Sequence, residues 1–419
     1  MKDVCLIIPP APFLGDQKRN CPLGVLYIAS YLEKHGVDVC VSDFRSGGTD
    51  NDLVHRADWY GISATTPEYH IAEKIASYFR ANLDCKIILG GPHATALPES
   101  ISSVFDHVVT GEGETAALAL VKGEAKDRVI RHPFINRLDD IPFPARHLLP
   151  RSSIVSDRLC MPGVLATTMM ISRGCAYDCS FCSSKSIWGR RLRYRSVFNV
   201  IDEIKHLISR YQVYCYRFQD DTMTINRPWV ESFCSEVRKA NLNILWRVNT
   251  RVDNAETSIF ERMKQAGCYE VGFGIEDPRE SVRKINNKQV DTELSYCAIH
   301  NAKTAGLKVR LFLMIGLPGQ DANTADELIS YVERTEPDAV DLSTFIPFPG
   351  SDIYKYPDKY GFKLKDHSFS DYVFTVGLYD DEYKKDFIYE HDILSNDELK
   401  QQRKAVLDYI STRNLVHNR

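Results

Sequence analysis

The chain has 419 residues, enough for two or three domains that each bury a core of their own. Its formal net charge of −4, with 44% hydrophobic and 26% charged residues, is ordinary for a globular protein and argues against a general nucleic-acid binder. No apolar run reaches the roughly 18 residues that span a bilayer, and the first residues predict a strand rather than a signal peptide. Twelve cysteines without a secretory signal suit a reducing cytoplasm.

Residues 1–125 alternate between strand and helix patterns. Strands are predicted at residues 4–8, 37–41, 59–63, 86–89 and 106–109, and helices at 23–35, 68–81 and after Gly113. Such alternation predicts a parallel, doubly wound sheet, in which ligands bind beyond the carboxyl ends of the strands. These ends carry small or hydroxyl-bearing residues and two other polar ones, namely Ser63, Thr65, Thr66, Gly90, Gly91, His93, Gly111 and Glu112. They let a large, flat ligand approach the backbone and so predict a ligand crevice.

Residues 126–163 are predicted to be a linker, because Ile141-Pro-Phe-Pro-Ala-Arg146 and Pro162-Gly163 interrupt any regular pattern. An apolar run at residues 164–171 predicts a buried strand, and Gly174 allows a sharp turn at its end.

Three cysteines follow that turn in a C-x3-C-x2-C spacing, namely Cys175, Cys179 and Cys182. Three thiolates so close together can hold three irons of a [4Fe–4S] cube and leave the fourth iron open for another ligand. A structural zinc site would need a fourth protein ligand, and none stands at suitable spacing downstream. The remaining alternative is three unrelated core cysteines. The other nine cysteines are interpreted as small core hydrophobes.

Further strands are predicted at residues 214–220, 244–249, 269–275, 309–315 and 339–346, with helices between them. Six strand–helix units after the linker predict a partial (β/α)6 barrel, whose active site would lie at the carboxyl ends of the strands. Asp220 and Asp221 close the first of these strands and could bind an ammonium group or cap a turn. The basic run from Lys185 to Arg195 is interpreted as a solvated face rather than a phosphate site, with Arg195 positioning the next helix.

Residues 356–419 are tyrosine- and charge-rich at first, up to Tyr389. The extension is predicted to be mostly helical, with a capped helix from Ser395 through Tyr409 whose packing stripe is Leu399, Val406, Leu407 and Ile410. This extension is expected to close the open side of the barrel and to carry determinants of substrate choice.

The cysteine loop resembles that of the radical S-adenosylmethionine (SAM) enzymes. By this resemblance residues 164–355 form the radical SAM barrel, and SAM chelates the open iron. The resemblance also implies SAM contacts at the strand ends and turns, made by Asp220, Asp221, Arg251, Glu276, Arg310, Gly316 and Pro347. One departure is Asp277-Pro278 after Glu276, where the family usually has serine.

Cys21-Pro-Leu-Gly24 and the G-I-S-A-T-T, G-G-P-H-A-T and G-E-G-E segments resemble the cobalamin-binding domain that precedes many radical SAM barrels. The resemblance implies that residues 1–125 form a Rossmann-like cobalamin domain, with the strand-end residues named above as its contacts. Ala11–Asp16 replaces the D-x-H-x-x-G motif that supplies a cobalt ligand in other B12 proteins, as is common in the radical SAM branch. The alternative is a vestigial or repurposed domain. His93 could contact a corrin or cap its own turn.

Together these resemblances imply reductive cleavage of SAM to a 5′-deoxyadenosyl radical. The leading hypothesis is a cobalamin-dependent methyltransferase acting on an unactivated carbon of a small molecule, with flavodoxin or ferredoxin as electron donor and no nucleic-acid or membrane partner. A rearrangement, cyclisation or oxidation with the same cofactors is the second hypothesis. A non-catalytic sensor is the third, and SAM-type turns argue against it. A tRNA methylthiolating enzyme would need an extra cluster-binding cysteine pattern and a basic RNA domain. The catalytic residues, the substrate and the oligomeric state stay unknown.

Overall fold

The computed structural model describes residues 2–46, 55–365, 368–373 and 386–415. The chain forms two compact units. The first comprises residues 1–174, 183–196 and 368–373, and the second comprises residues 175–182, 197–367 and 374–419. Among the described residues, every helix is too short or too polar to span a bilayer.

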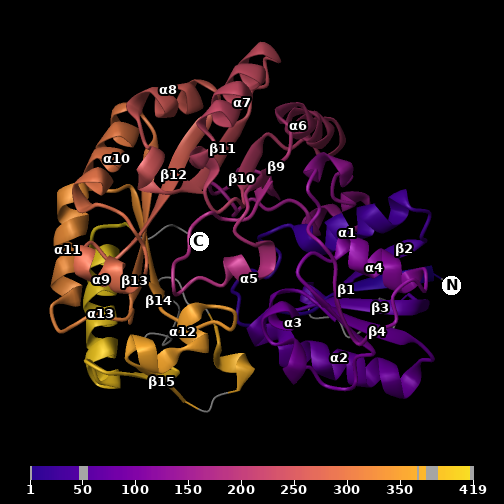
Figure 1. Ribbon diagram of the computed structural model, residues 1–419. Helices are drawn as coiled ribbons and strands as arrows, with labels where there is room; N and C mark the ends of the chain where they lie inside the picture. The colour runs from indigo at the N-terminus through magenta and orange to yellow at the C-terminus, as the bar shows by residue number, and fades with distance from the viewer. Residues whose placement is uncertain (1, 47–54, 366–367, 374–385, 416–419) are drawn as a thin grey trace. The chain divides into compact units, whose positions relative to one another are not determined.

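The first unit is built on a six-stranded sheet with the order β2-β1-β3-β4-β5-β6. Its strands are β1 (Lys2–Ile8), β2 (Val39–Asp43), β3 (Ala57–Ser63), β4 (Lys86–Gly90), β5 (His107–Thr110) and β6 (Val129–Arg131), and its helices are α1 (Leu23–Lys34), α2 (Tyr69–Asn82), α3 (Pro92–Ala96) and α4 (Glu114–Val121). All neighbouring strands are parallel. Figure 1 shows α1 and α4 on one face of the sheet and α2 on the other, so the predicted doubly wound fold is confirmed.

The strand order explains why the predicted crevice residues come together. β2 and β3 lie on opposite sides of β1, so the chain changes direction across the sheet there. Loops leave such a point to opposite faces and open a space between them, which is where open α/β sheets bind ligands. Residues 4–8 of β1 are buried throughout, as expected for a parallel strand covered on both faces.

One strand of this sheet was not predicted. Residues 129–131, expected within the linker, form β6 and pair with β5. Three residues flanked by Arg128 and His132 are too short a pattern to read as a strand. Only Ile130 of β6 is buried, which is typical of a short edge strand.

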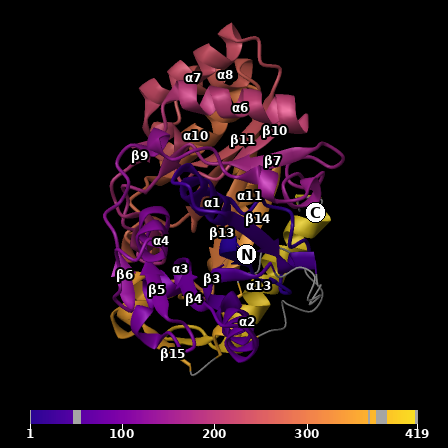
Figure 2. The ribbon, with the colours of Figure 1, turned by 90° about the vertical axis from the view of Figure 1, so that its right-hand side faces the viewer.

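The second sheet has the strand order β14-β13-β12-β11-β10-β7. Its strands are β7 (Ala166–Met169), β10 (Cys215–Phe218), β11 (Leu245–Thr250), β12 (Cys268–Glu276), β13 (Lys308–Ile315) and β14 (Ala339–Thr344), and the helices along it are α6 (Val197–Tyr211), α7 (Arg227–Lys239), α8 (Thr257–Gln265), α9 (Glu280–Ile285), α10 (Thr292–Thr304) and α11 (Thr324–Thr335). The pairs from β10 to β14 are parallel. Figure 2 shows α6, α7 and α8 on the outer side of β10 and β11. The predicted partial (β/α)6 barrel is confirmed.

The cluster loop lies within a long connection between two short antiparallel strands, β8 (Ser172–Arg173) and β9 (Arg193–Tyr194). This connection also contains α5 (Ser184–Trp188). The predicted strand at residues 164–171 is therefore shorter in the structure, because β7 ends at Met169 and β8 begins at Ser172.

The C-terminal part contains α12 (Asp352–Lys355), β15 (Phe362–Leu364), β16 (Tyr389–His391) and α13 (Asn396–Thr412). The side chain of Ser395 caps α13 together with Glu398, as the sequence predicts. The antiparallel β15–β16 pair was not foreseen in a segment predicted to be mostly helical. Residues 366–367 and 374–385, within the tyrosine- and charge-rich stretch, lie outside the described residues.

Three buried charges, Arg247, Glu270 and Arg310, and the half-buried Asp341 join the amino ends of the four barrel strands β11 to β14. Arg310 Nε donates to Glu270 Oε1 at 3.0 Å, and Arg247 Nη1 donates to the same oxygen at 2.9 Å. Asp341 accepts from Arg310 at 3.2 Å. Burial alone would raise the pKa of Glu270, but Arg310 and Arg247 outweigh it and lower this pKa to about 2.

This network makes the stability of the second unit depend on pH. Because the folded pKa of Glu270 lies below its unfolded value, its ionisation contributes about 3 kcal/mol at neutral pH. That contribution is lost as the pH falls from about 4.5 towards 2. We expect Glu270→Gln to lower the free energy of unfolding by about this amount at pH 7 and by much less at pH 3, as measured by urea unfolding.

Glu231→Gln is the matched control, because Glu231 pairs with Arg227 in a partly exposed i,i+4 ion pair. It should cost no more than about 0.5 kcal/mol. Equal losses of unfolding free energy for Glu270→Gln and Glu231→Gln at pH 7 would show that the buried network stabilises the protein no more than an exposed ion pair does.

Candidate functional site

The cluster loop is brought out of the β8 strand by a glycine with a left-handed backbone. Gly174 has a φ of +100°, and a Cβ at this position would collide with the carbonyl oxygen of Arg191. Cys175, Cys179 and Cys182 follow, all half-buried. The backbone N–H of Cys182 donates to the carbonyl of Cys179 at 3.1 Å, which closes a turn between these two thiols.

Two segments of the second unit hold the cluster loop by its backbone. Ser180 donates its N–H to the carbonyl of Asn286 at 3.0 Å and accepts at its own carbonyl from the N–H of Ile353 at 3.1 Å. Asn287 Nδ2 donates to the carbonyl of Asp178 at 2.7 Å. A loop without regular structure thus obtains its shape from barrel residues far away in the sequence.

Two cations pack on the aromatic side chains of the cluster loop. The guanidinium of Arg251 lies 3.5 Å from the centroid of the Tyr177 ring, and the ammonium of Lys288 lies 5.9 Å from that of Phe181. Burial raises the pKa of the Cys179 thiol, whereas Lys288 and Arg251 oppose this shift. Positive charge beside the thiols favours the thiolate form that binds iron.

Three cysteines on one loop suit an iron–sulfur cube. Within the described ranges, no three His, Cys, Asp or Glu side chains are grouped as ligands of one ion. A cube makes no such demand, because each of its cysteines binds a different iron.

The carboxyl ends of the second sheet carry most of the residues predicted to bind SAM. Asp220 and Asp221 follow β10, Arg251 follows β11, and Glu276 ends β12, while Gly316 and Pro347 come after β13 and β14. Asp221 lies close enough to Cys175 to raise the pKa of its thiol, although burial is the larger cause.

Glu276 has the features of a ligand contact. Its backbone has a φ of +67°, a conformation that non-glycine residues rarely keep without a reason. Its Oε1 accepts from Lys288 Nζ at 2.6 Å, whereas Oε2 is buried with no hydrogen-bond partner among the described residues. A buried carboxylate oxygen without a partner is costly, so this atom suits a ligand that brings an N–H or O–H donor.

Gly316 begins a turn that only glycine can make at this position. Its φ is +95°, and a Cβ would collide with the hydroxyl of Tyr389. Tyr389 donates this hydroxyl to the carbonyl of Gly316 at 2.9 Å, and the imidazole Nε2 of His391 lies 3.1 Å from the carbonyl of Leu317. The C-terminal β16 strand therefore packs on this turn.

Arg310 is the predicted SAM residue that the structure does not bring to the others. It stands near the start of β13, in register with Gly272 and Ala339, where its guanidinium belongs to the network with Glu270 and Asp341. Besides Arg251, the basic side chain near these carboxyl ends is Lys288, which the sequence did not predict. No motif marks it, and its contacts with Glu276 and with Phe181 of the cluster loop reveal it.

The first unit contains a cavity of about 330 Å³ with mainly apolar walls. Five predicted cobalamin contacts line it, namely Ser63, Gly90, Gly91, Gly111 and Glu112. Its volume is in the range of small-molecule sites. A whole corrinoid is larger than this cavity, so the fit extends to a part of the molecule such as its nucleotide tail.

The other three predicted contacts do not line this cavity. The hydroxyl of Thr65 bonds the carboxylate of Glu68 at 2.7 Å. His93 is fully buried, its ring stacked on Tyr69 at 4.2 Å between centroids and its Nδ1 lying 3.4 Å from Thr66 Oγ1. Burial lowers the pKa of His93 to about 4, so the ring is neutral at pH 7.

A buried group of four charges adjoins the cavity. Arg173 lies 2.6 Å from Glu114 and 3.1 Å from Glu112, and Arg193 lies 2.9 Å from Glu112. The interpretation of the basic run as a solvated face is therefore wrong for Arg193 and Arg195, which are buried. Their partners are distant in sequence, so the run alone could not reveal them.

The comparisons agree with both halves of this description. Residues 169–332 match the family model of the Radical SAM superfamily, and residues 19–121 match that of the B12 binding domain. An uncharacterized methyltransferase of Pyrococcus horikoshii is 29% identical over 84% of this chain and 82% of its own. An anaerobic magnesium-protoporphyrin IX monomethyl ester cyclase of Rubrivivax gelatinosus is 27% identical over 85% of this chain and 69% of its own.

Solved structures share the fold. The radical SAM methyltransferase TsrM from Kitasatospora setae, with tryptophan substrate and a SAM analog bound, has a TM-score of 0.67 and 15% identity, over 89% of this chain and 82% of its own. The cobalamin-dependent radical enzyme OxsB, with aqua-cobalamin and SAM bound, has a TM-score of 0.67 and 17% identity, over 88% of this chain and 54% of its own.

Residues 169–332 therefore form a radical SAM domain, and residues 19–121 form a B12-binding domain. The cofactors that these two domains imply are a [4Fe–4S] cluster, SAM and cobalamin. Enzymes of this class act on a small molecule and need a reductant.

The cluster assignment can be tested by iron content. After anaerobic reconstitution we expect about four irons per chain, and we expect the triple variant Cys175→Ala, Cys179→Ala and Cys182→Ala to retain none. Cys297→Ala, at an exposed cysteine outside the loop, should bind iron like the wild type. Iron and sulfide analysis together with the absorbance spectrum decides the matter, and a triple variant that still holds its cluster would contradict the assignment.

The charge of Lys288 should tune the cluster. Removing a cation beside the thiolates disfavours the more negative, reduced cluster, so Lys288→Met should lower its midpoint potential by on the order of tens of millivolts. Lys264→Met removes the same charge next to Gly306, at the amino end of β13, and should leave the potential unchanged. A potentiometric titration followed by electron paramagnetic resonance measures both, and equal shifts would rule out a local effect.

Proposed function

We propose that this enzyme is a cobalamin-dependent methyltransferase that adds a methyl group to an unactivated carbon of a small molecule. The observation that carries the proposal is the joint presence of a radical SAM barrel and a B12-binding domain on one chain. The similarity to an uncharacterized methyltransferase over 84% of the chain supports it.

When bound, the cluster and SAM supply reductive cleavage of SAM, and cobalamin supplies the methyl group. The chain contributes binding and orientation. Cys175, Cys179 and Cys182 would hold the cluster, and Arg251 and Lys288 would balance its negative charge. Glu276 Oε2 would accept a hydrogen bond from the amino group or a ribose hydroxyl of SAM. Gly316 stays a predicted SAM contact, and its missing Cβ makes room for the Tyr389 hydroxyl.

In the first unit, the glycines at the ends of β4 and β5 would let a flat ring system lie against the backbone. Gly90, Gly91 and Gly111 all line the cavity there, and its mainly apolar walls suit a heterocycle. We assign this cavity to part of the cobalamin molecule. A flavodoxin or ferredoxin would supply the electron, and a reducing cytoplasm would suit the twelve cysteines, none of which forms a disulfide in the structure.

Cyclisation with the same cofactors is the second candidate. The cyclase of Rubrivivax gelatinosus matches 85% of this chain at nearly the same identity as the methyltransferase. Both reactions would begin with the same cleavage of SAM, so the geometry of the cluster loop does not separate them.

The products of SAM distinguish the two reactions. Methyl transfer consumes two SAM molecules, one giving S-adenosylhomocysteine and the other giving methionine and 5′-deoxyadenosine. It would take two electrons from the reductant, one for the cleavage of SAM and one to return cobalamin to the oxidation level that accepts the next methyl group. We expect equal amounts of S-adenosylhomocysteine and 5′-deoxyadenosine when cobalamin-loaded enzyme is incubated with reductant, SAM and a small-molecule cell extract. Methyl-deuterated SAM should transfer its label to one extract component, detectable by mass spectrometry.

Cyclisation would give 5′-deoxyadenosine without S-adenosylhomocysteine and without label in the product. Cys179→Ala enzyme is the control and should form no 5′-deoxyadenosine. Enzyme purified under saturating cobalamin that retains none of it, by absorbance and mass analysis, would contradict the methyltransferase proposal and leave radical SAM cleavage standing.

A further inference from the structure

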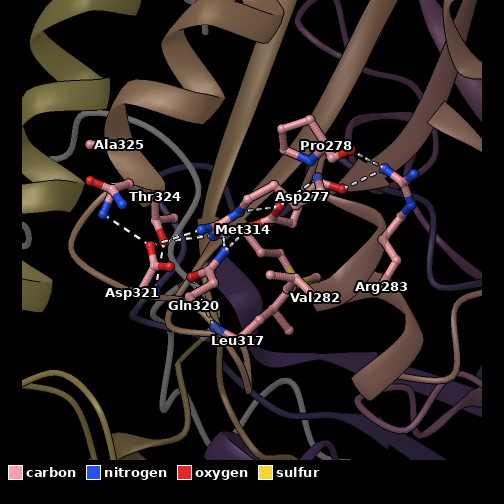
Figure 3. Close-up of polar contacts among 12 residues, drawn as sticks. Asp277, Pro278, Val282, Arg283, Met314, Leu317, Gln320, Asp321, Thr324 and Ala325 are labelled. Carbon is pink, nitrogen blue, oxygen red and sulfur yellow. Dashed lines mark hydrogen bonds and ion pairs between the residues drawn. The ribbon is translucent and has the colours of Figure 1, made fainter. Parts of the chain in front are cut away.

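Asp277, the residue that departs from the family pattern, is fully buried just beyond the end of β12. Its carboxylate accepts from Arg279 Nη2 at 2.8 Å and from Arg279 Nε at 3.1 Å. Gln320 Nε2 also donates to Asp277 Oδ2, at 2.9 Å. Figure 3 shows the side chains of Asp277, just after β12, and Gln320, in the turn after β13, pointing toward each other. A fully buried carboxylate is retained only where it is paired and hydrogen-bonded, as it is here.

Gln320 uses its whole hydrogen-bonding capacity in this position. Its Oε1 accepts from the N–H of Gly316 at 2.6 Å and from the N–H of Leu317 at 3.1 Å. Its Nε2 donates to the carbonyl of Met314 at 2.9 Å as well as to Asp277. The side chain is fully buried. It therefore fixes both the backbone of the turn that begins at Gly316 and the distance from that turn to β12.

The same segment reaches the cluster loop through Asn286. Its Nδ2 donates to the carbonyl of Pro318 at 2.9 Å, in the turn after β13, and its own carbonyl accepts the N–H of Ser180. Arg283 fixes the start of this segment, because its Nη1 donates to the carbonyls of Asp277 and Pro278 at 2.9 and 2.7 Å (Figure 3).

The hydrogen bonds of Asp277 help to hold the strained backbone of Glu276. A left-handed conformation at a non-glycine residue persists only where the surroundings determine it more strongly than the local preference. The residue that follows, Asp277, is locked by Arg279 and Gln320, so the direction of the Glu276 side chain is locked as well.

We propose that Gln320 and Asp277 are positioning residues of the SAM site. Together they hold the Gly316 turn and the Glu276 carboxylate at a fixed separation, so that both face the same SAM molecule. The inference rests on the proposed function only in requiring that SAM binds at these strand ends. Neither residue touches the reacting atoms.

The decisive variant is Gln320→Glu, which exchanges one NH2 group for an oxygen. Oε1 can still accept from the turn, but the new oxygen faces Asp277 and the carbonyl of Met314, where no hydrogen bond can form without an added proton. We expect the Kd for SAM to rise about tenfold to a hundredfold, with iron content unchanged. Equilibrium binding of SAM to the reconstituted holoprotein measures this, and the SAM-induced change in the cluster resonance provides a second readout.

Gln402→Glu is the matched control. Gln402, on α13, is also buried, with Oε1 accepting from the N–H of Ala325 and Nε2 donating to the carbonyl of Asp321, each at 2.8 Å. It makes the same kind of contact with the start of α11 but touches neither strand end. The Gln402→Glu variant should bind SAM with the wild-type Kd, even if it loses as much thermal stability as Gln320→Glu.

Asp277→Asn keeps an acceptor oxygen for Gln320 but removes the charge that pairs with Arg279. It should raise the Kd for SAM by a smaller factor, about threefold to tenfold, and it decides the question if Gln320→Glu does not fold.

A folded Gln320→Glu holoprotein that binds SAM with wild-type affinity would overturn this inference but not the proposed function. The same holds for equal losses in the Gln320 and Gln402 variants. A wild-type holoprotein that holds its irons but binds no SAM would overturn the proposed function, and the inference with it.

Discussion

The geometry of the candidate site depends on how the second unit holds a cysteine loop that has no regular structure of its own. Its backbone is bonded to Asn286, Asn287 and Ile353, and its two aromatic rings are covered by Arg251 and Lys288. Three thiols attached to a free loop would lose much of their binding energy to the entropy of ordering it. Here hydrogen bonds from the barrel supply part of that ordering.

The residues that hold the loop also hold the strand ends. The segment that begins at Asp277 contacts the end of β12, the turn after β13 and the cluster loop within ten residues. The site is therefore one continuous set of hydrogen bonds. Preorganisation of this kind lowers the cost of placing reacting groups in a fixed geometry.

Much of this could be predicted from the sequence. Period and turn signals located the five long strands of the barrel and the strands β1 to β5, because buried parallel strands give unbroken apolar runs. The cysteine spacing predicted the cluster loop. The three-residue strand β6 and the pair β15–β16 are too short to give a period. The roles of Lys288, Gln320 and Arg193 were missed because they depend on partners distant in sequence. Arg310 was predicted to bind SAM, but it stands near the amino end of its strand, away from the other predicted residues.

The buried charges beside the first-unit cavity balance each other. Arg173 and Arg193 carry two positive charges, and Glu112 and Glu114 carry two negative ones. A ligand entering this cavity therefore meets little net field from its walls. Its affinity should respond weakly to ionic strength, and selection among ligands there should rest on shape and dispersion rather than on charge.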